Sequence, residues 1–201
     1  MIKRIPLAHG VFEDVEDVKR YDKEAKRRIL GVSRGFVLTA RKWGITTGTI
    51  LDVGTGTGLL AIEFAKAIPE VHVIGLDLSA VVLDVARDNA QMSDMSLRVS
   101  FERGDAEDMP FEDDVFDLVV SSNTLHLIRY PTRMFNETRR VLKPEGKFFF
   151  SDFRRSWLGL FSQHIRAAYS PNEIRDLLGQ SQLQNWAVRD YFFWLSILSE
   201  K

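Results

Sequence analysis

Cysteine is absent from this 201-residue chain. Its absence excludes disulfide bonds, thiolate metal sites and any covalent mechanism that uses a sulfur nucleophile. Long apolar runs are missing as well, since no stretch approaches the roughly 20 residues that cross a bilayer. The basic pair Lys3 and Arg4 leads into no apolar segment of the kind found in signal peptides. We therefore expect a cytoplasmic protein without membrane insertion.

An excess of positive charge is also lacking. The chain carries 27 Lys and Arg against 28 Asp and Glu, for a net charge of −1. Nucleic-acid binding depends on basic residues that neutralise phosphates, so no nucleic-acid partner is expected. Apolar residues make up 45% and charged residues 27%, as in globular proteins. The length suits one domain, which we expect to span residues 1–201.

Three glycines at every second position follow an apolar strand in residues 50–58, which read Ile-Leu-Asp-Val-Gly-Thr-Gly-Thr-Gly. Glycine allows a sharp turn and lets a ligand approach the backbone closely. Good helix formers follow, so the free N–H groups of a helix N-terminus face the loop. The next apolar run ends at Asp77, where open α/β sheets place acids that bind ribose hydroxyls. The pattern predicts an adenosyl ligand, with Asp77 on its ribose.

The glycine spacing separates two possible cofactors. A dinucleotide fingerprint, G-x-G-x-x-G, would place its third glycine at Leu59, whereas this chain has Gly58. The spacing favours S-adenosylmethionine over NAD. A tight turn without a cofactor is the plain alternative, because glycine-rich loops also occur for structural reasons.

Further motifs follow in order: Gly-Asp-Ala-Glu-Asp-Met-Pro-Phe at 104–111, Phe-Asp-Leu-Val-Val-Ser-Ser-Asn-Thr-Leu-His at 116–126, and Val-Leu-Lys-Pro-Glu-Gly-Lys at 141–147. With these motifs the chain resembles the class I S-adenosylmethionine-dependent methyltransferases, especially the ubiquinone and menaquinone biosynthesis C-methyltransferases. The resemblance covers most of the chain.

The resemblance implies a set of cofactor-binding residues, with S-adenosylhomocysteine as the product. Asp105 and Ala106 would flank the adenine, and the loop with Ser122 and Asn123 would border the methionine part. The full set is Asp52, Gly54, Thr55, Gly56, Gly58, Asp77, Leu78, Asp105, Ala106, Ser122 and Asn123.

From residue 49 onward, strands and helices alternate, which predicts a mostly parallel sheet with helices on both faces. Expected strands are 49–54, 71–77, 97–103, 115–121 and 146–152, and expected helices are 58–67, 79–91 and 131–141. A capping box at Ser170 to Glu173 opens a helix through about residue 178. Two final strands lie within residues 188–198. By resemblance, the fold is an α/β, Rossmann-like, doubly wound sheet of seven strands with a reversed C-terminal strand.

Two amphipathic helices are expected before the sheet. The first has Phe12, Val15, Val18, Tyr21 and Ala25 on its apolar face; the second has Val32, Phe36, Val37, Ala40 and Trp43, and ends at Gly44. In related methyltransferases such helices cover the cofactor, which makes Tyr21 and Phe36 candidate pocket residues. Docking of both aromatic side chains onto the sheet is the alternative. The expected parts are a helical cover at 1–46, a cofactor-binding core at 47–153, a substrate cover at 154–170 and a C-terminal part at 171–201.

Charge is uneven along the chain. Eight acids lie between residues 102 and 117, but their spacing matches no calcium loop, so we expect a solvated loop and no metal site. Ten bases face four acids between residues 129 and 175. Arg154 and Arg155 follow a strand end, where Arg154 is a candidate for binding an anionic substrate. Residues 157–169 carry enough apolar side chains to line a substrate pocket, although a plain packed connector is equally consistent with them.

Methyl transfer from a sulfonium needs a base only if the acceptor must lose a proton. His126 lies just beyond the expected strand 115–121, and histidine is the usual side chain for proton transfer near neutral pH, so His126 is the candidate catalytic base. His164, in the expected substrate cover, is the second candidate. A packed or hydrogen-bonded role is the alternative for either histidine.

Several acceptors are excluded by comparison with relatives. Cytosine C5 and arsenite methyltransferases need cysteines. Amide and adenine amino methyltransferases carry an acid or asparagine, two prolines and an aromatic residue where this chain has Ser122 to Leu125. We expect a small-molecule acceptor that takes the methyl group on carbon, oxygen, nitrogen or sulfur. Two other functions stay open: a regulator or partner subunit that binds S-adenosylmethionine without transferase activity, and an NAD-dependent oxidoreductase. The sequence makes no prediction about oligomeric state.

Overall fold

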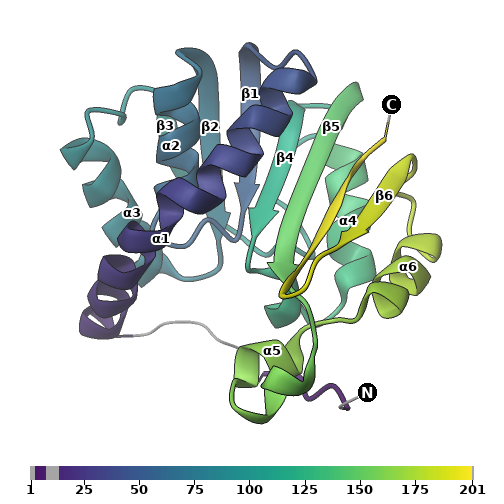
Figure 1. Ribbon diagram of the computed structural model, residues 1–201. Helices are drawn as coiled ribbons and strands as arrows, with labels where there is room; N and C mark the ends of the chain where they lie inside the picture. The colour runs from purple at the N-terminus through teal and green to yellow at the C-terminus, as the bar shows by residue number, and fades with distance from the viewer. Residues whose placement is uncertain (1–2, 8–13, 201) are drawn as a thin grey trace.

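A computed structural model describes residues 3–7 and 14–200. A seven-stranded sheet lies between two helical layers (Figure 1), as the sequence predicted. Phe12, expected on the first helix, lies outside the described residues. Among the helices that the structure describes, none is both long and apolar enough to cross a membrane.

The observed elements match the expected ones to within a few residues at most ends. The strands are β1 (Thr47–Val53), β2 (Glu70–Asp77), β3 (Val99–Arg103), β4 (Phe116–Ser122), β5 (Leu142–Phe153), β6 (Trp186–Asp190) and β7 (Trp194–Ser199). The helices are α1 (Val15–Lys42), α2 (Leu59–Ala67), α3 (Ala80–Met92), α4 (Pro131–Val141), α5 (Gln163–Ala167) and α6 (Pro171–Gly179), with 3₁₀ turns η1 (Leu125–Leu127) and η2 (Trp157–Leu160).

The strand order is β3-β2-β1-β4-β5-β7-β6. Strands β1 to β5 pair in parallel, whereas β7 is antiparallel to both β5 and β6, which confirms the reversed C-terminal strand. The order changes direction between β1 and β4. Open α/β sheets bind ligands beyond the carboxyl ends of the strands at such a switch point.

Side chains of successive strand residues point to opposite faces of the sheet, so the core consists of two clusters, one on each face. Ile50 joins the cluster beneath α1, α2 and α3, and the adjacent Leu51 joins the cluster beneath α4 and α6. Successive strand residues point to opposite faces, so a strand buried on both faces has a continuous apolar sequence. Figure 1 shows the two helical layers on either side of the sheet.

The prediction of two N-terminal helices is wrong, because α1 is one continuous helix of 28 residues. Its N-cap, Asp14, accepts hydrogen bonds from the backbone N–H of Glu16 (2.8 Å) and Asp17 (3.1 Å). Gly31 lies between the two expected helices, but one glycine costs only about 1 kcal/mol and no proline interrupts the segment. The helix ends before Gly44, as expected.

Phe36 lies in the core and not in a ligand pocket. Its ring is 2% exposed and stacks on Phe149 with 4.2 Å between ring centroids. The docking alternative therefore holds for Phe36, which fixes the second half of α1 to the sheet.

Candidate functional site

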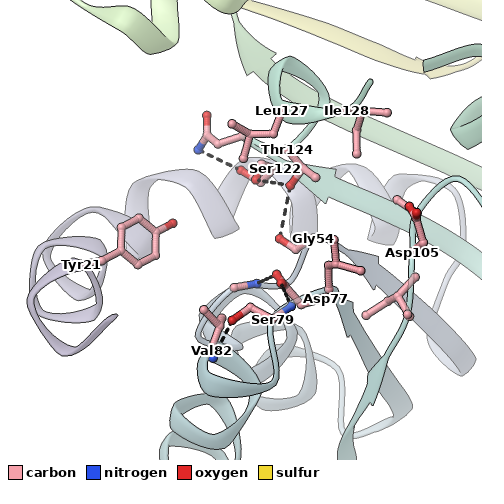
Figure 2. Close-up of a pocket in the computed structure, with 16 residues that line it drawn as sticks. Tyr21, Gly54, Asp77, Ser79, Val82, Asp105, Ser122, Thr124, Leu127 and Ile128 are labelled. Carbon is pink, nitrogen blue, oxygen red and sulfur yellow. Dashed lines mark hydrogen bonds between the residues drawn. The ribbon is translucent and has the colours of Figure 1, made fainter. Parts of the chain in front are cut away.

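One pocket opens beyond the carboxyl ends of β1, β2 and β4, at the switch point of the sheet (Figure 2). Four loops and α1 contribute to its wall. The lining residues are Tyr21, Gly54, Gly56, Leu76, Asp77, Leu78, Ser79, Val82, Gly104, Asp105, Ala106, Ser122, Asn123, Thr124, Leu127 and Ile128. The structure thus brings together nine of the residues that the sequence singled out for ligand binding.

The glycine loop has backbone conformations that favour glycine. Gly54, Gly56 and Gly58 have φ angles of 69°, 56° and 77°. A Cβ on Gly54 would lie 2.3 Å from the side chain of Thr124, and one on Gly58 would lie 2.6 Å from the ring of Phe101. A Cβ on Gly56 would meet nothing closer than 3.9 Å. Gly54 and Gly58 therefore permit close packing, whereas Gly56 leaves room on the pocket side.

Asp77 ends β2 at the pocket wall. One carboxylate oxygen accepts a hydrogen bond from the Gly56 N–H (3.0 Å) and the other from the Ser79 N–H (3.0 Å). Burial raises the pKa of Asp77, and these backbone hydrogen bonds oppose the rise. The carboxylate is thereby oriented beside the glycine loop, where it can accept hydrogen bonds from a ligand.

Asp52, Thr55 and Gly58 do not line the pocket; they support the loop from behind. Asp52 is 1% exposed and accepts a hydrogen bond from the Thr55 hydroxyl (2.7 Å). Burial raises the pKa of Asp52 to about 7, against the effect of hydrogen bonds from Thr55 and the Ala61 backbone. Gly58 is the N-cap of α2. These three residues shape the loop and start the helix.

Asn123 supplies an unusual feature on the opposite wall, after β4. It has a φ of 57°, which few residues other than glycine adopt. Its side-chain oxygen is buried and has no hydrogen-bond partner among the described residues. Buried polar atoms are rarely left unpaired in proteins. A ligand with a donor group would satisfy this oxygen, so the residues present fit a polar cofactor.

Tyr21 lies over the pocket from α1, and Figure 2 shows its side chain facing the glycine loop across the opening. Burial raises the pKa of its hydroxyl. No pattern in the sequence predicted the polar contacts that hold this part of α1. Asn89 of α3 donates to Asp22 of α1 (2.9 Å) and to the backbone carbonyl of Thr57 (2.9 Å), and accepts from Lys26 (2.8 Å).

His126 and His164 contact each other. Neither of them lines the pocket, although Leu127 and Ile128, which follow His126, do. The Nδ1 atom of His126 lies 2.8 Å from Asp152, and its Nε2 atom lies 3.1 Å from the Nδ1 atom of His164. His126 and Asp152 are each 3% exposed, whereas His164 is exposed. Burial, followed by the neighbouring His126, lowers the pKa of His164. The sequence named both histidines but not Asp152.

Arg154 lies apart from this pocket. It lines a second hollow with Arg155, Ser156, Trp157, Ser170, Pro171 and Phe192. Its Nε atom lies 2.9 Å from a carboxylate oxygen of Asp190, so the charge of Arg154 is already paired. The structure does not bring Arg154 to the pocket that the glycine loop forms.

The acidic segment 102–117 serves several structural contacts. Glu107 accepts from the backbone N–H of Arg129 and Tyr130, and Lys143 pairs with Asp117. Within the described ranges, no three His, Asp or Glu side chains are grouped so that they could hold a metal ion.

Comparisons with known proteins identify relatives of this chain. Residues 46–187 match a family described as a methyltransferase domain. The demethylmenaquinone methyltransferase of Deinococcus radiodurans is 35% identical over 149 residues, covering 73% of this chain and 61% of that protein. The ubiquinone/menaquinone biosynthesis C-methyltransferase UbiE of Geobacter sulfurreducens is 30% identical over 197 residues, covering 87% of this chain and 76% of that protein.

A solved structure has the same fold as this chain. A SAM-dependent methyltransferase from Aquifex aeolicus superposes with a TM-score of 0.75 at 19% identity, over 93% of this chain and 98% of that one. The chain spans about three fifths of the length of its Deinococcus relative.

Proposed function

The chain belongs to the class I S-adenosylmethionine-dependent methyltransferases, and from that premise we propose that it transfers a methyl group from S-adenosylmethionine to a small-molecule acceptor. The observation that carries the proposal is the pocket at the switch point, which gathers Asp77, Gly56 and the unpaired oxygen of Asn123 in one place. On this proposal residues 47–153 bind the cofactor, and residues 1–46 and 154–170 cover it.

Each part of the pocket has a proposed role toward the cofactor. Asp77 would accept hydrogen bonds from the ribose hydroxyls, and Asp105 with Ala106 would flank the adenine. Gly54 and Gly56 would allow the methionine part to approach the loop backbone. Asn123 would pair its buried oxygen with a donor on the methionine part, beside Ser122. Asp52, Thr55 and Gly58 would act indirectly, by holding the loop.

S-adenosylmethionine, when bound, supplies an electrophilic methyl group that an acceptor takes by in-line displacement, leaving S-adenosylhomocysteine. The protein then contributes mainly alignment. Well-oriented reactants reach effective molarities of about 10⁵ to 10⁸ M, so a pocket that holds donor and acceptor in line supplies much of the catalysis. Tyr21 lies over the same pocket and would help to confine the acceptor.

The histidine pair would take up a proton where the acceptor loses one. Asp152 as a carboxylate can only accept hydrogen bonds, so the Nδ1 atom of His126 carries the proton between them. The Nε2 atom of neutral His126 must then accept from the Nδ1–H of His164. This leaves a lone pair on the Nε2 atom of His164. In this arrangement His164 accepts the proton from the acceptor, and His126 orients the His164 ring.

Two observations support a small-molecule acceptor. The relatives from Deinococcus and Geobacter are named for methylation in menaquinone and ubiquinone biosynthesis. The net charge of −1 is unsuited to binding nucleic acids. A cytoplasmic location stays a prediction from the sequence.

The cofactor assignment is tested by calorimetry with S-adenosylhomocysteine and NAD. We expect the chain to bind S-adenosylhomocysteine and not NAD. Asp77→Asn keeps the side-chain size but removes the charge, and Asp77→Ala removes the side chain. Loss of hydrogen bonds to a charged group costs about 1.5 to 3 kcal/mol, so Asp77→Ala should weaken binding about 10- to 100-fold.

Asp84→Ala is the matched control, because the Asp84 side chain is 76% exposed on α3 and its one salt bridge among the described residues is with Arg87. The control should bind like the unaltered chain. Unchanged affinity in both Asp77 variants would exclude the ribose assignment. Binding of NAD alone would exclude the proposed activity.

A further inference from the structure

Large apolar side chains are exposed at one corner of the molecule. Phe161 is 81% exposed and Phe192 is 69% exposed, values that are unusual for aromatic residues of a globular protein. We call this surface the aromatic corner. It consists of Trp157, Leu160, Phe161, Tyr191, Phe192 and Phe193, which come from η2 with the residue after it and from the β6–β7 turn.

The two segments of the aromatic corner form one surface. Trp157 and Phe192 line the same hollow. The backbone N–H of Arg154, at the end of β5, donates to the carbonyl of Phe193 (2.9 Å), which ties the β6–β7 turn to the start of the η2 segment. Figure 1 shows the turn between β6 and β7 at the same end of β5 as α5. Contiguous exposed apolar surface of this kind marks an interaction site.

The surroundings of the aromatic corner are basic. Residues 3–7 and 154–169 contain five Lys and Arg and no Asp or Glu. The two segments are adjacent, because the N–H of Ile5 donates to the carbonyl of Arg166 (3.3 Å) and Arg4 donates to Ala167 (2.7 Å).

Some of this positive charge is not neutralised. Arg154 pairs with Asp190, and Arg155 pairs with Glu173. Among the described residues, Lys3, Arg4 and Arg166 form no salt bridge with an acidic side chain. A net positive charge therefore surrounds the apolar surface.

We propose that the aromatic corner docks on the surface of a bilayer that contains anionic lipids. Aromatic side chains favour the interface between headgroups and hydrocarbon, and neighbouring Lys and Arg are attracted to anionic headgroups. The exposed groups lie on a short 3₁₀ turn and a strand turn, so they can enter the interface while the sheet stays outside it. Docking of this type needs no spanning helix and is independent of methyl transfer.

The test is sedimentation of the intact chain with vesicles of phosphatidylcholine, with or without phosphatidylglycerol. We expect binding to the vesicles that contain phosphatidylglycerol and a marked loss of binding at high salt, because salt screens exposed charges. Trp157→Ser with Phe161→Ser should weaken binding about tenfold or more. Both side chains are exposed, so melting curves should stay close to that of the unaltered chain.

Met92→Ser with Leu97→Ser is the matched control. These side chains are 80% and 94% exposed and precede β3, at the end of the sheet opposite the carboxyl end of β5. The control should bind vesicles normally. Absence of vesicle binding, or equal binding by both double variants, would overturn the proposal. Self-association of the chain that only the Trp157 and Phe161 variant abolishes would assign the surface to a second copy and also overturn it.

Discussion

The protonation state of His164 is set by two neighbours and by partial burial. Burial lowers its pKa most, and the adjacent His126 lowers it further, while Asp152 raises it. A histidine with a pKa below its ordinary value is unprotonated at neutral pH. His164 is therefore ready to accept a proton on its Nε2 atom, which is the property that the proposed role requires.

Substitution of His126 should raise the pKa of His164. His126→Gln removes the second of the two lowering causes but leaves burial, so the pKa of His164 should increase. NMR titration of the imidazole signals measures this directly and requires no acceptor. His72→Gln is the control, because His72 is exposed on β2 and should not affect His164. A pKa of His164 that is unchanged in His126→Gln would contradict the proposed coupling.

At the scale of elements, α1 is held against the pocket at the switch point by polar contacts as well as by its apolar face. Asn89 joins α3 to Asp22 of α1 and to the glycine loop at Thr57. Asn89 and Asp22 are only 5% and 6% exposed, so their polar groups depend on each other. The contact positions the part of α1 that carries Tyr21.

Asn89→Ala should loosen the first half of α1. The substitution leaves buried polar atoms of Asp22 and Thr57 without this partner, which costs about 1 to 3 kcal/mol. Relative to the unaltered chain, amide hydrogen exchange should accelerate more in residues 15–28 than in β1 and β4. Asn172→Ala is the control. Asn172 is exposed on α6, so its substitution should change the free energy of unfolding by less than about 0.5 kcal/mol. Equal acceleration throughout the sheet would show that Asn89 supports the whole core instead.

At the scale of the whole molecule, the sheet buries a carboxyl group at its centre. Asp52 is the last residue but one of β1, and burial raises its pKa from 3.8 to about 7. Between these two values the folded chain keeps this proton, whereas the unfolded chain has lost it. The unfolded state thus binds fewer protons, and the contribution of Asp52 to stability falls as pH rises through this range.

The stability of Asp52→Asn should depend less on pH than that of the unaltered chain. Each factor of ten in the ionisation equilibrium corresponds to about 1.4 kcal/mol, so the loss between pH 4 and 7 is on the order of 4 kcal/mol. Urea denaturation at several pH values, with the difference between the two proteins plotted against pH, isolates this contribution. A difference that does not change with pH would mean that Asp52 ionises normally in the folded chain.

Local patterns in the sequence predicted most helices and strands and most of the residues named for cofactor binding that line the pocket. Gly54, Gly56 and Gly58 occupy positions with positive φ angles, a conformation that glycine adopts without help from other residues. Short apolar runs along the chain predicted strands that the structure confirms. Asp77 was predicted because it ends an apolar run, whereas Asn123 was predicted only through the family resemblance. Both line the pocket because a parallel sheet gathers its carboxyl ends at one edge.

Tertiary structure decided which distant residues meet. His126 and His164 are 38 positions apart, and Asn89 and Asp22 are 67 apart, so no local spacing predicts either contact. Arg154 lies beside Asp190, and not at the pocket of the glycine loop, because the β6–β7 hairpin packs against the end of β5. The continuity of α1 also depends on packing, since burial against α2 and α3 outweighs the weak helix propensity of its glycines. Local sequence determines backbone conformation residue by residue, whereas side-chain partners depend on how the fold arranges helices, strands and loops that are distant in sequence.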